Sequence, residues 1–322
     1  MNDKKTVVVL MPTYNDWTSA AELLPKIDRQ LADHGHRGRI VIVDDGSPNL
    51  SGRERIGTLR FAAIETISCL TLYRNCGNQR SLAIGVSYCA KEMTGDYLVT
   101  MDSDLEDNPE YIPRLIEASV AGRDQNIVFA ERTKRSEGPF FRVFYRCYQA
   151  IYRALTGMQI AIGNYSILPW PMVGRVANIA ELWSHYPAAV MRAKIPYVAI
   201  PTRRGIRMMG KSTMNFQNML LHGFGAFSVH AETVGVRTLT GIAVAVPAIL
   251  VLYLALAPEA GAPAGWAAWI TGAALFLLFQ LAVAASFMIF VVITVRMHSA
   301  MIPVLEYRKF ILTEERLISP AE

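Results

Sequence analysis

Two acidic stretches decide the fold of this chain: VDDGS at Val43–Ser47 and MDSDLE at Met101–Glu106. Each follows an apolar run typical of a buried strand, Ile40–Val43 and Tyr97–Met101. The carboxyl ends of neighbouring parallel strands meet along one edge of a sheet, and open α/β proteins bind ligands at that edge. We therefore expect the acidic side chains of both stretches to line one crevice.

Strand-like and helix-like patterns alternate from residue 6 to residue 131, which predicts an α/β fold with a parallel, right-handed sheet. Besides the two runs above, the expected strands are Val7–Leu10, Ile67–Leu72 and Ile127–Ala130. The expected helices are Ser19–His34, Gln79–Met93 and Glu110–Val120, the last capped by Asn108.

The acidic residues suit a metal and a phosphorylated ligand. Asp102 and Asp104 stand one residue apart after a strand, and Mg²⁺ or Mn²⁺ commonly binds one or two carboxylates together with substrate phosphates. A D-x-D pattern alone is common by chance, but its position and the earlier pair Asp44-Asp45 strengthen it. We expect Asp44 to accept hydrogen bonds from a nucleobase or ribose.

The composition indicates a membrane segment. Of the 322 residues 52% are hydrophobic and only 18% are charged, and Glu259 is the one charged residue between Arg237 and Arg296. Two apolar runs, Thr238–Ala257 and Trp266–Val295, are each long enough to cross a hydrocarbon core of about 30 Å. The alternative is a buried helical hairpin, which a soluble core of this size does not need.

Charge predicts the orientation of these spans. Their link, Pro258–Gly265, contains no Lys or Arg, whereas their other ends carry Arg237, Arg296, Arg308 and Lys309. The positive-inside rule then places the catalytic domain and both termini in the cytoplasm, in an integral protein of the cytoplasmic membrane. The N-terminus has no apolar signal core, and the four cysteines form no C-x-x-C pair, as expected in a reducing compartment.

Other segments have the pattern of membrane-interface elements. Residues 138–157 combine an aromatic face with arginines, which is typical of an interfacial helix, although a helix packed on the sheet has similar spacing. Met214–Val229 resembles a second such helix. The basic cluster at 203–211 suits a lipid phosphate, or it contributes only to solubility and topology.

We divide the chain into a cytoplasmic catalytic domain at 1–212 that includes the interfacial helix 138–157, a juxtamembrane amphipathic helix at 213–233, a transmembrane hairpin at 234–297 and a cytoplasmic tail at 298–322. Motifs of dinucleotide folds, P-loops, serine hydrolases and zinc proteases are absent from the sequence. We expect no nucleic-acid partner.

Four segments together resemble glycosyltransferase family 2, which has the GT-A (nucleotide-diphospho-sugar transferase, Rossmann-like) fold: Pro12–Asn15, Val43–Ser47, Arg74–Gly77 and Met101–Asp104. More narrowly, the chain is similar to the polyprenyl-phosphate glycosyltransferases of the dolichyl-phosphate mannosyltransferase-like branch. The resemblance extends from residue 6 to about residue 215 and includes Gly163–Ser166 and Arg203–Ser212.

The resemblance implies an inverting transfer of one sugar from a UDP- or GDP-sugar to undecaprenyl or dolichyl phosphate, with Mg²⁺ or Mn²⁺. By matching position it assigns the nucleotide to Pro12, Tyr14, Asn15, Asp44, Asp45, Asn75, Gly77, Asp102 and Ser103. It assigns the metal to Asp102, Asp104 and Glu106. It assigns catalysis to Asp102, Asp104 and the donor-side Arg132. It assigns the acceptor phosphate to Arg142, Arg146, Arg207, Lys211 and Ser212. Bacterial relatives suggest a homo-oligomer, a dimer or a tetramer.

Departures from the family pattern affect these assignments. Glu106 stands where many relatives have Gln, and Arg146 stands where a serine is expected. Thr213 replaces a frequent Lys, so Lys211 or Arg146 would complete the acceptor clamp. The Q-x-x-R-W motif of processive members is absent from the sequence, which favours a single transfer.

Two other functions stay open at this point. One is a membrane enzyme that glycosylates a lipid hydroxyl, which would require a general base. The other is a non-enzymatic nucleotide-sugar binder or scaffold. The sequence does not name the sugar or the nucleotide, and the loops Arg132–Phe140 and Gln159–Tyr165 are where we expect that specificity to lie.

Overall fold

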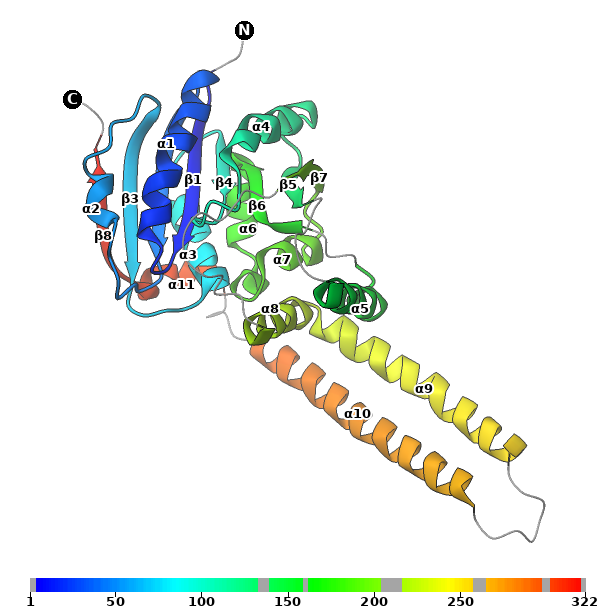
Figure 1. Cartoon of the computed structure of the whole chain (residues 1–322). Helices are drawn as coiled ribbons and strands as arrows, with labels where there is room; N and C mark the ends of the chain where they lie inside the picture. The colour runs from blue at the N-terminus through cyan, green and yellow to red at the C-terminus, as the bar shows by residue number, and fades with distance from the viewer. Residues whose placement is uncertain are drawn as a thin grey trace. The chain divides into compact units, whose positions relative to one another are not determined.

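The computed structural model describes residues 4–132, 139–158, 162–203, 216–256, 265–296 and 302–319. The chain forms two compact units (Figure 1). The globular unit comprises Met1–Pro139, Ile160–Val229 and Ala300–Glu322. The helical unit comprises Phe140–Gln159 and His230–Ser299.

An eight-stranded mixed sheet forms the centre of the globular unit, in the order β7-β5-β6-β4-β1-β2-β3-β8. Its strands are β1 (Thr6–Thr13), β2 (Arg37–Asp44), β3 (Ile64–Leu72), β4 (Tyr97–Thr100), β5 (Ile127–Arg132), β6 (Ile162–Pro169), β7 (Tyr197–Thr202) and β8 (Ile311–Ile318). The five strands predicted between residues 6 and 131 all run in the same direction, as expected. The sheet is mixed because β6 and β8, which follow that region in the sequence, run antiparallel to their neighbours. An apolar run predicts a strand but not its direction, since direction depends on the connection that precedes it.

Helices cover both faces of this sheet. Helices α1 (Trp17–Asp33) and α4 (Ile112–Ala121) pack on one face, and α3 (Asn78–Glu92), α6 (Trp170–Ala177) and α7 (Tyr186–Arg192) pack on the other. Alternate residues of β1 therefore enter two separate cores, and all of its apolar side chains are buried. This double coverage explains the unbroken apolar runs of the central strands.

The central strands end where polar loops begin. The turn after β2 contains Gly46, whose φ is +70° and whose amide donates to the carbonyl of Asp44 at 2.8 Å. Helix α4 follows a 3₁₀ turn at Pro109–Tyr111, and Asn108 Oδ1 accepts the amide of Glu110 at 3.1 Å. The capping role predicted for Asn108 is confirmed.

The segment after the last long helix belongs to the globular fold and is not a separate tail. Strand β8 pairs with β3 at the sheet edge, and the short helix α11 (Pro303–Glu306) precedes it. Arg53 of α2 (Arg53–Ile56) donates to Glu315 at 2.8 Å, and Tyr88 of α3 donates to Glu314. This segment therefore closes one edge of the sheet, and no periodicity in the sequence had predicted its strand.

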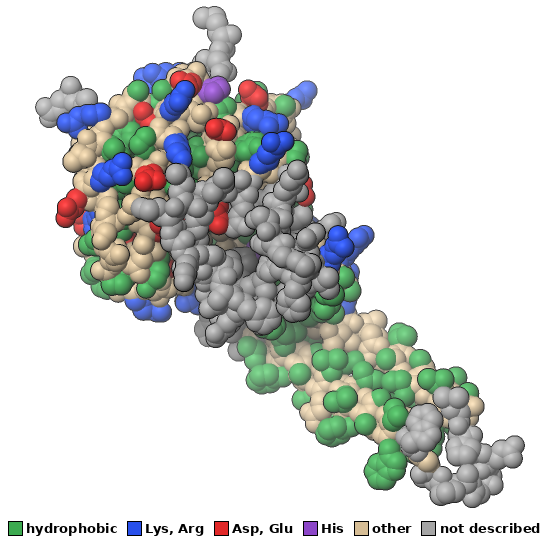
Figure 2. All heavy atoms as spheres, viewed as in Figure 1, with side chains coloured by type: hydrophobic (Ala, Val, Ile, Leu, Met, Phe, Trp, Pro, Cys, Tyr) green, Lys and Arg blue, Asp and Glu red, His purple; other side chains and the backbone are tan. Residues whose placement is uncertain are grey.

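Two long apolar helices dominate the helical unit. Helices α9 (Ala231–Leu256) and α10 (Trp266–Arg296) contain candidate membrane spans at Ala231–Ala255 and Ala268–Val291. Figure 2 shows hydrophobic side chains over the surface of this hairpin, and its spans are almost wholly unburied within the chain. At 25 residues the first span is about 37 Å long, enough to cross a hydrocarbon core.

Helix α5 (Pro139–Thr156) packs within the same unit. Arg237 of α9 donates from Nη1 to the carbonyl of Ala154 at 2.9 Å, and the rings of Tyr152 and His230 lie 6.0 Å apart at their centroids. The helix predicted at 138–157 is present. Its proposed place in the membrane interface stays a prediction. Helix α8 (Phe216–Val229), the second helix predicted as interfacial, belongs to the globular unit.

Gly46→Ala should destabilise the globular unit. An L-residue in this left-handed conformation costs about 1–2 kcal/mol, and the new Cβ would lie 2.8 Å from the carbonyl carbon of Arg74. Gly174→Ala in α6 is the matched control, since it meets no atom within 4 Å and removes a helix-interior glycine. Thermal unfolding should show a lower Tm for the first variant and an unchanged or higher Tm for the second. Equal Tm values would contradict this account of the turn.

Candidate active site

The loops that follow β1 and β2 are tied together at the carboxyl edge of the sheet. The amide of Asn15 donates to Ser47 Oγ at 2.8 Å, and Asn15 Oδ1 accepts the amide of Asn49 at 3.0 Å. Asn15 has a φ of +54°, a conformation that asparagine tolerates better than most residues. Pro12 is buried beneath this junction, whereas Tyr14 is 42% exposed and accessible to a ligand.

Asp45 joins the loop after β3 to the end of β2. Its side chain is buried and accepts the amides of Cys76 at 2.6 Å and Gly77 at 2.8 Å. Burial raises the pKa of Asp45, and the two backbone hydrogen bonds oppose that rise. Gly77 is the residue immediately before helix α3, so Asp45 fixes where this helix starts. Asn75, also assigned to the nucleotide, is exposed in the same loop.

Asp44 presents an unused acceptor. Its side chain is fully buried and Oδ1 accepts the amide of Ser47 at 3.2 Å, but Oδ2 has no hydrogen-bond partner among the described residues. Burial raises the pKa of Asp44, and the nearby Arg53 guanidinium lowers it. A buried acceptor without a donor is unfavourable, so an N–H or O–H group of a ligand would satisfy Oδ2. Trp17 Nε1, under the Arg53 guanidinium, is likewise buried and unpaired among the described residues.

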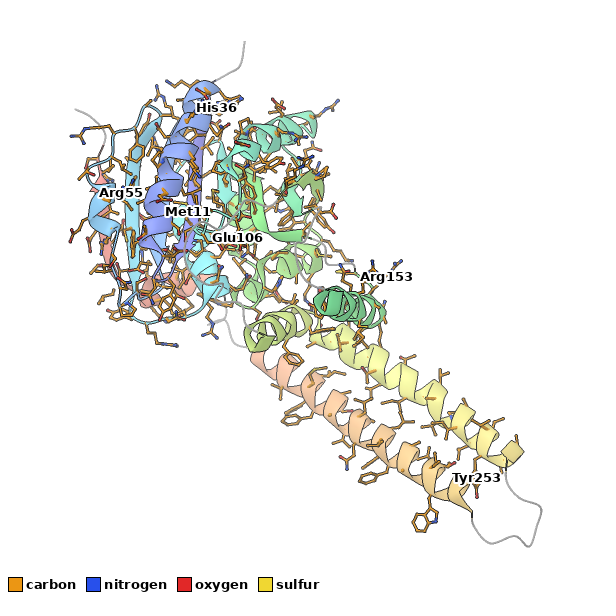
Figure 3. All side chains as sticks on the ribbon, viewed as in Figure 1. Met11, His36, Arg55, Glu106, Arg153 and Tyr253 are labelled. Atoms are coloured by element: carbon orange, nitrogen blue, oxygen red, sulfur yellow. The ribbon has the colours of Figure 1, made fainter. Side chains whose placement is uncertain are left out.

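The loop after β4 concentrates negative charge. Asp102 Oδ1 accepts from Asn78 Nδ2 at 3.1 Å, and the amide of Asp102 donates to the buried Asp107 at 2.9 Å. Asp104 Oδ1 accepts the amide of Glu106 at 3.0 Å. Figure 3 labels Glu106 in this loop. Two side chains of the loop thus bind its own amides, and a third contact joins it to α3.

Electrostatics make this loop receptive to a cation. The pKa of Asp104 is raised to about 7, first by burial and then by the negative charges of Asp102 and Glu106. Among the described residues no group of three His, Cys, Asp or Glu side chains is arranged to hold a metal ion by itself. Two carboxylates are nevertheless enough for Mg²⁺, which keeps positions for water and phosphate oxygens. Asp102 and Asp104 therefore fit a metal that shares its coordination with a ligand.

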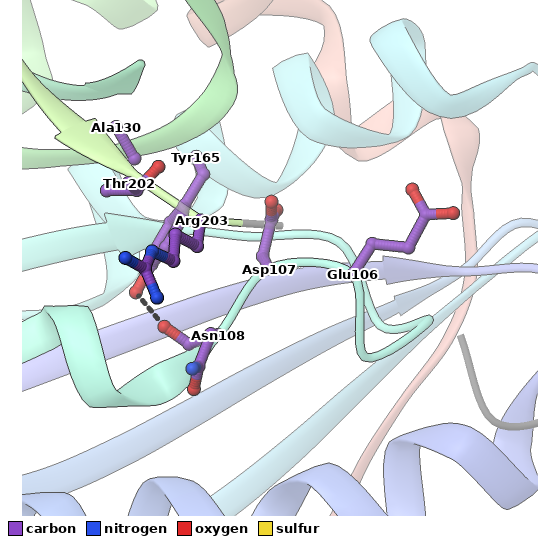
Figure 4. Close-up of a pocket in the computed structure, with 7 residues that line it drawn as sticks. All are labelled: Glu106, Asp107, Asn108, Ala130, Tyr165, Thr202 and Arg203. Atoms are coloured by element: carbon purple, nitrogen blue, oxygen red, sulfur yellow. Dashed lines mark hydrogen bonds between the residues drawn. The ribbon is translucent and has the colours of Figure 1, made fainter. Parts of the chain in front are cut away.

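A small pocket lies beside the same loop (Figure 4), lined by Glu106, Asp107, Asn108, Ala130, Tyr165, Thr202 and Arg203. The hydroxyl of Tyr165 donates to the carbonyl of Asn108 at 2.9 Å, which fixes the floor of the pocket. The carboxylate of Glu106 points away from the other lining residues in Figure 4. The role of Glu106 as a third metal ligand stays a prediction.

The residues assigned to catalysis and to the acceptor are only partly described. Arg132 is the last residue of β5, at the carboxyl edge of the sheet. Arg142 and Arg146 belong to helix α5, and the side chain of Arg146 is exposed. Arg207, Lys211 and Ser212 lie outside the described residues, as do residues 133–138 of the first loop expected to set specificity and residues 159–161 of the second. These acceptor assignments stay predictions.

Sequence reasoning missed the polar residues that support the acidic loop. Asn78 and Gln79 begin α3, directly after the glycine that Asp45 binds, and Asp107 lies under the main chain of Asp102. Their position after a loop at the carboxyl edge of a strand was the only signal available, because side-chain partners far apart in sequence leave no periodic pattern.

The mixed sheet, covered by helices on both faces and with acidic loops at its carboxyl edge, defines a GT-A-type α/β protein. Residues 8–175 match the sequence profile of glycosyl transferase family 2. The chain belongs to that family, and the resemblance noted from its motifs is confirmed.

Two relatives within this family carry the same enzyme name. The chain is 28% identical over 220 residues to the undecaprenyl-phosphate 4-deoxy-4-formamido-L-arabinose transferase of Klebsiella pneumoniae, a match that covers 67% of this chain and 64% of the relative. The enzyme of the same name from Erwinia tasmaniensis is 30% identical over 164 residues, covering 51% of this chain and 48% of the relative. The matched region is thus a little under two thirds of the first relative's length.

A solved structure supports the fold. Glucosyl-3-phosphoglycerate synthase of Mycobacterium tuberculosis, in complex with Mn²⁺, UDP-glucose and phosphoglyceric acid, superposes with a TM-score of 0.51 at 15% identity. The superposition covers 72% of this chain and 80% of the synthase. At this identity the comparison establishes the GT-A architecture alone.

Asp45→Ala should destabilise the site and the fold together, because it removes a buried carboxylate that accepts the part-buried amides of Cys76 and Gly77. Each such loss costs about 1–3 kcal/mol, so the variant should unfold at a clearly lower temperature. Asp33→Ala at the exposed end of α1, where the ion pair to Arg29 spans 3.6 Å, is the control and should change stability little. Thermal unfolding of both detergent-solubilised variants makes the comparison. Similar Tm values would contradict the role given to Asp45.

Proposed function

We propose that this chain transfers a single sugar from a nucleotide-diphosphate sugar to a polyprenyl phosphate, with inversion at the anomeric carbon. The observation that carries the proposal is the convergence of Asp44, Asp45, Asp102 and Asp104 at one edge of the sheet in a chain that also has two candidate membrane spans. The relatives named for transfer to undecaprenyl phosphate support the acceptor class.

The donor side of the reaction is assigned to described residues. Asp44 Oδ2 would accept an N–H of the base or a ribose hydroxyl, and Asp45 would keep the neighbouring loop in place. Asp102 and Asp104 would hold the divalent cation. A bound Mg²⁺ or Mn²⁺ would supply Lewis-acid stabilisation of the leaving diphosphate. The neighbouring synthase that carries Mn²⁺ with UDP-glucose supports a cation in this architecture.

The transfer itself forms one bond and breaks one. An oxygen of the acceptor phosphate bonds to the anomeric carbon, and the bond from that carbon to the diphosphate oxygen breaks, so the nucleoside diphosphate departs with the electron pair. The acceptor phosphate is already an anion at neutral pH and needs no strong general base. Positioning and charge stabilisation can therefore supply most of the rate enhancement.

Arginines are suited to the acceptor phosphate because their planar guanidinium groups bind phosphate oxygens in pairs. We assign this role to Arg142, Arg146 and Arg207, with Lys211 and Ser212, and a donor-side role to Arg132. The apolar helices α9 and α10 would bring a lipid phosphate to the protein from the membrane. We further propose that the globular unit and both termini are cytoplasmic and that the protein forms a homo-oligomer.

A donor screen tests the proposal. Purified full-length protein in detergent, with Mg²⁺ or Mn²⁺, would receive undecaprenyl or dolichyl phosphate and a panel of UDP- and GDP-sugars. We expect one donor to give a lipid-linked sugar that a chelator suppresses. Product formed only with a diacylglycerol or ceramide would favour the hydroxyl-acceptor enzyme, with a rate that rises as its general base loses a proton. Nucleotide binding without product on any lipid would favour a scaffold.

Asp104 should make metal binding depend on pH. Its pKa of about 7 means that a proton occupies the carboxylate below neutrality, and a proton and a metal compete for the same oxygens. The affinity for Mn²⁺ should therefore fall by up to about tenfold for each pH unit below 7. Calorimetry between about pH 5.5 and pH 8 would measure this trend.

Asp104→Asn is the companion variant. It should bind Mn²⁺ weakly with little dependence on pH, lose nearly all sugar transfer and unfold at a temperature close to that of the wild type. Normal turnover by this variant, or equal Mn²⁺ affinity of the wild type at pH 6 and pH 8, would remove Asp104 from the metal site.

A further inference from the structure

A chain of buried hydroxyls fixes the end of β6 that lies beside the acidic loop. Thr100 Oγ1 donates to the carbonyl of Asn164 at 2.6 Å, and it lies 2.8 Å from Ser166 Oγ, which lies 2.7 Å from the hydroxyl of Tyr186. Since Thr100 uses its only hydroxyl proton on Asn164, Ser166 must donate to Thr100 and Tyr186 to Ser166. The main chain of Asn164 is therefore held rigidly from behind.

Contacts from two elements place Asn164 near the loop that carries Asp102. Thr100 of β4 pairs with Ser166 of β6, and the two strands are antiparallel. Strand β4 ends at Thr100 and Asp102 follows in the next loop, whereas Asn164 lies two residues before Ser166 on β6. Asn78 and Gln79, which are adjacent in α3, contact Asp102 and Asn164 respectively. Asn164 is therefore near the acidic loop, and it is half-buried.

The orientation of the Asn164 amide follows from one backbone donor. The amide N–H of Tyr186 can only donate, so the Gln79 side-chain atom that it meets at 2.7 Å must be the oxygen, Oε1. Gln79 Nε2 then faces Asn164 at 3.0 Å, and Asn164 must accept through Oδ1. The Nδ2 group of Asn164 is left free to donate, and no described residue receives its hydrogen bond.

A fixed donor beside clustered carboxylates suits an anionic or hydroxyl-bearing ligand. Asn78, the residue before Gln79, donates to Asp102, so the first turn of α3 sets both the carboxylate and the amide. A ligand whose phosphate oxygens share a cation with Asp102 would bring an acceptor within reach of Asn164. Because the donor is neutral, it adds a directional contact without displacing the cation.

We propose that Asn164 is a ligand-contacting residue that donates from Nδ2 to an oxygen of the nucleotide-diphosphate sugar, and that Gln79 is the positioning residue that fixes this orientation. The inference rests on the proposed function and deepens it, since it names a contact to the diphosphate or the sugar. The diphosphate and the sugar both offer an oxygen that accepts a hydrogen bond. The choice of ligand in the binding experiment distinguishes between them.

Three variants of the full-length protein test the contact. Asn164→Asp keeps an oxygen for Gln79 and the shape of the side chain but replaces the free donor with an acceptor. Asn164→Ala removes the donor without adding charge. Gln79→Glu still accepts from Tyr186 but offers Asn164 only an oxygen, so the Asn164 amide should rotate and turn Oδ1 to the crevice. The control is Asn178→Asp at the exposed end of α6, where Asn178 Nδ2 donates to the carbonyl of Gly174 and to no other described residue.

Calorimetry with Mg²⁺ would measure binding of UMP, UDP, GMP, GDP and the donor found in the screen. We expect all three variants to bind the donor about 10- to 100-fold more weakly than the wild type, with monophosphate binding and Tm changed little. Weaker binding of UDP or GDP as well as the donor would place the contact on the diphosphate. Weaker binding of the donor alone would place it on the sugar. The Asn178→Asp protein should bind every ligand as the wild type does.

Different results would overturn the contact, the assigned orientation or the proposed function. If Asn164→Ala binds the nucleotide sugar as tightly as the wild type, the proposed contact is overturned. Weaker binding by Asn164→Asp alone would then result from charge repulsion and not from the loss of a hydrogen-bond donor. Wild-type binding by Gln79→Glu would overturn the assigned orientation. A wild-type protein that binds no nucleotide or nucleotide sugar would overturn the proposed function and this inference with it, whereas a binding wild type with unaffected variants overturns the inference alone.

Discussion

The hydrogen bonds that Asp45 accepts from the amides of Cys76 and Gly77 are the contact on which the arrangement of the loops at this edge of the sheet depends. They fix the loop after β3 against the end of β2, and so they determine where α3 begins. The first residue of that helix, Asn78, then contacts Asp102 on the other side of the crevice. A single buried carboxylate thereby sets the spacing between the loop after β3 and the acidic loop after β4. Both carboxylate oxygens of Asp45 accept main-chain amides, so Asp45 has a structural role that does not require a ligand.

Around this framework the protein holds charges and polar atoms that it does not satisfy by itself. Asp44 keeps a buried oxygen with no hydrogen-bond partner among the described residues, and the pKa of Asp104 stands near 7 because the side chain is buried and its neighbours Asp102 and Glu106 are also acidic. A raised carboxylate pKa means that ionisation destabilises the folded state as the pH rises from the unfolded-state pKa towards 7, and that this loss persists above it. A cation and a donor-bearing ligand would relieve both features. Such strained electrostatics are characteristic of functional sites and not of ordinary surfaces.

The parts of this architecture that the sequence predicted are local. The apolar runs of β1 and β2, the acidic stretches that follow strands and the capping role of Asn108 each depend on residues adjacent in the chain. Strand direction in β6 and the recruitment of β8 could not be predicted, because they depend on connections through other elements. The Gln79–Asn164 hydrogen bond joins residues 85 positions apart, and neither residue type signals a partner. The motif resemblance indicated a candidate site, whereas packing alone revealed which residues support its loops.

The path of the chain also constrains how the apolar hairpin can lie in a membrane. Helix α8, which ends at Val229, and the segment from α11 to β8 both belong to the globular unit, so the chain leaves this unit before α9 and returns to it after α10. Tyr307 donates to Glu92 at 2.7 Å, which anchors the returning segment to α3. A folded unit cannot be divided between two sides of a bilayer. If the helices cross the membrane, they must therefore cross an even number of times, which agrees with the orientation inferred from the arginines at their outer ends and does not depend on it.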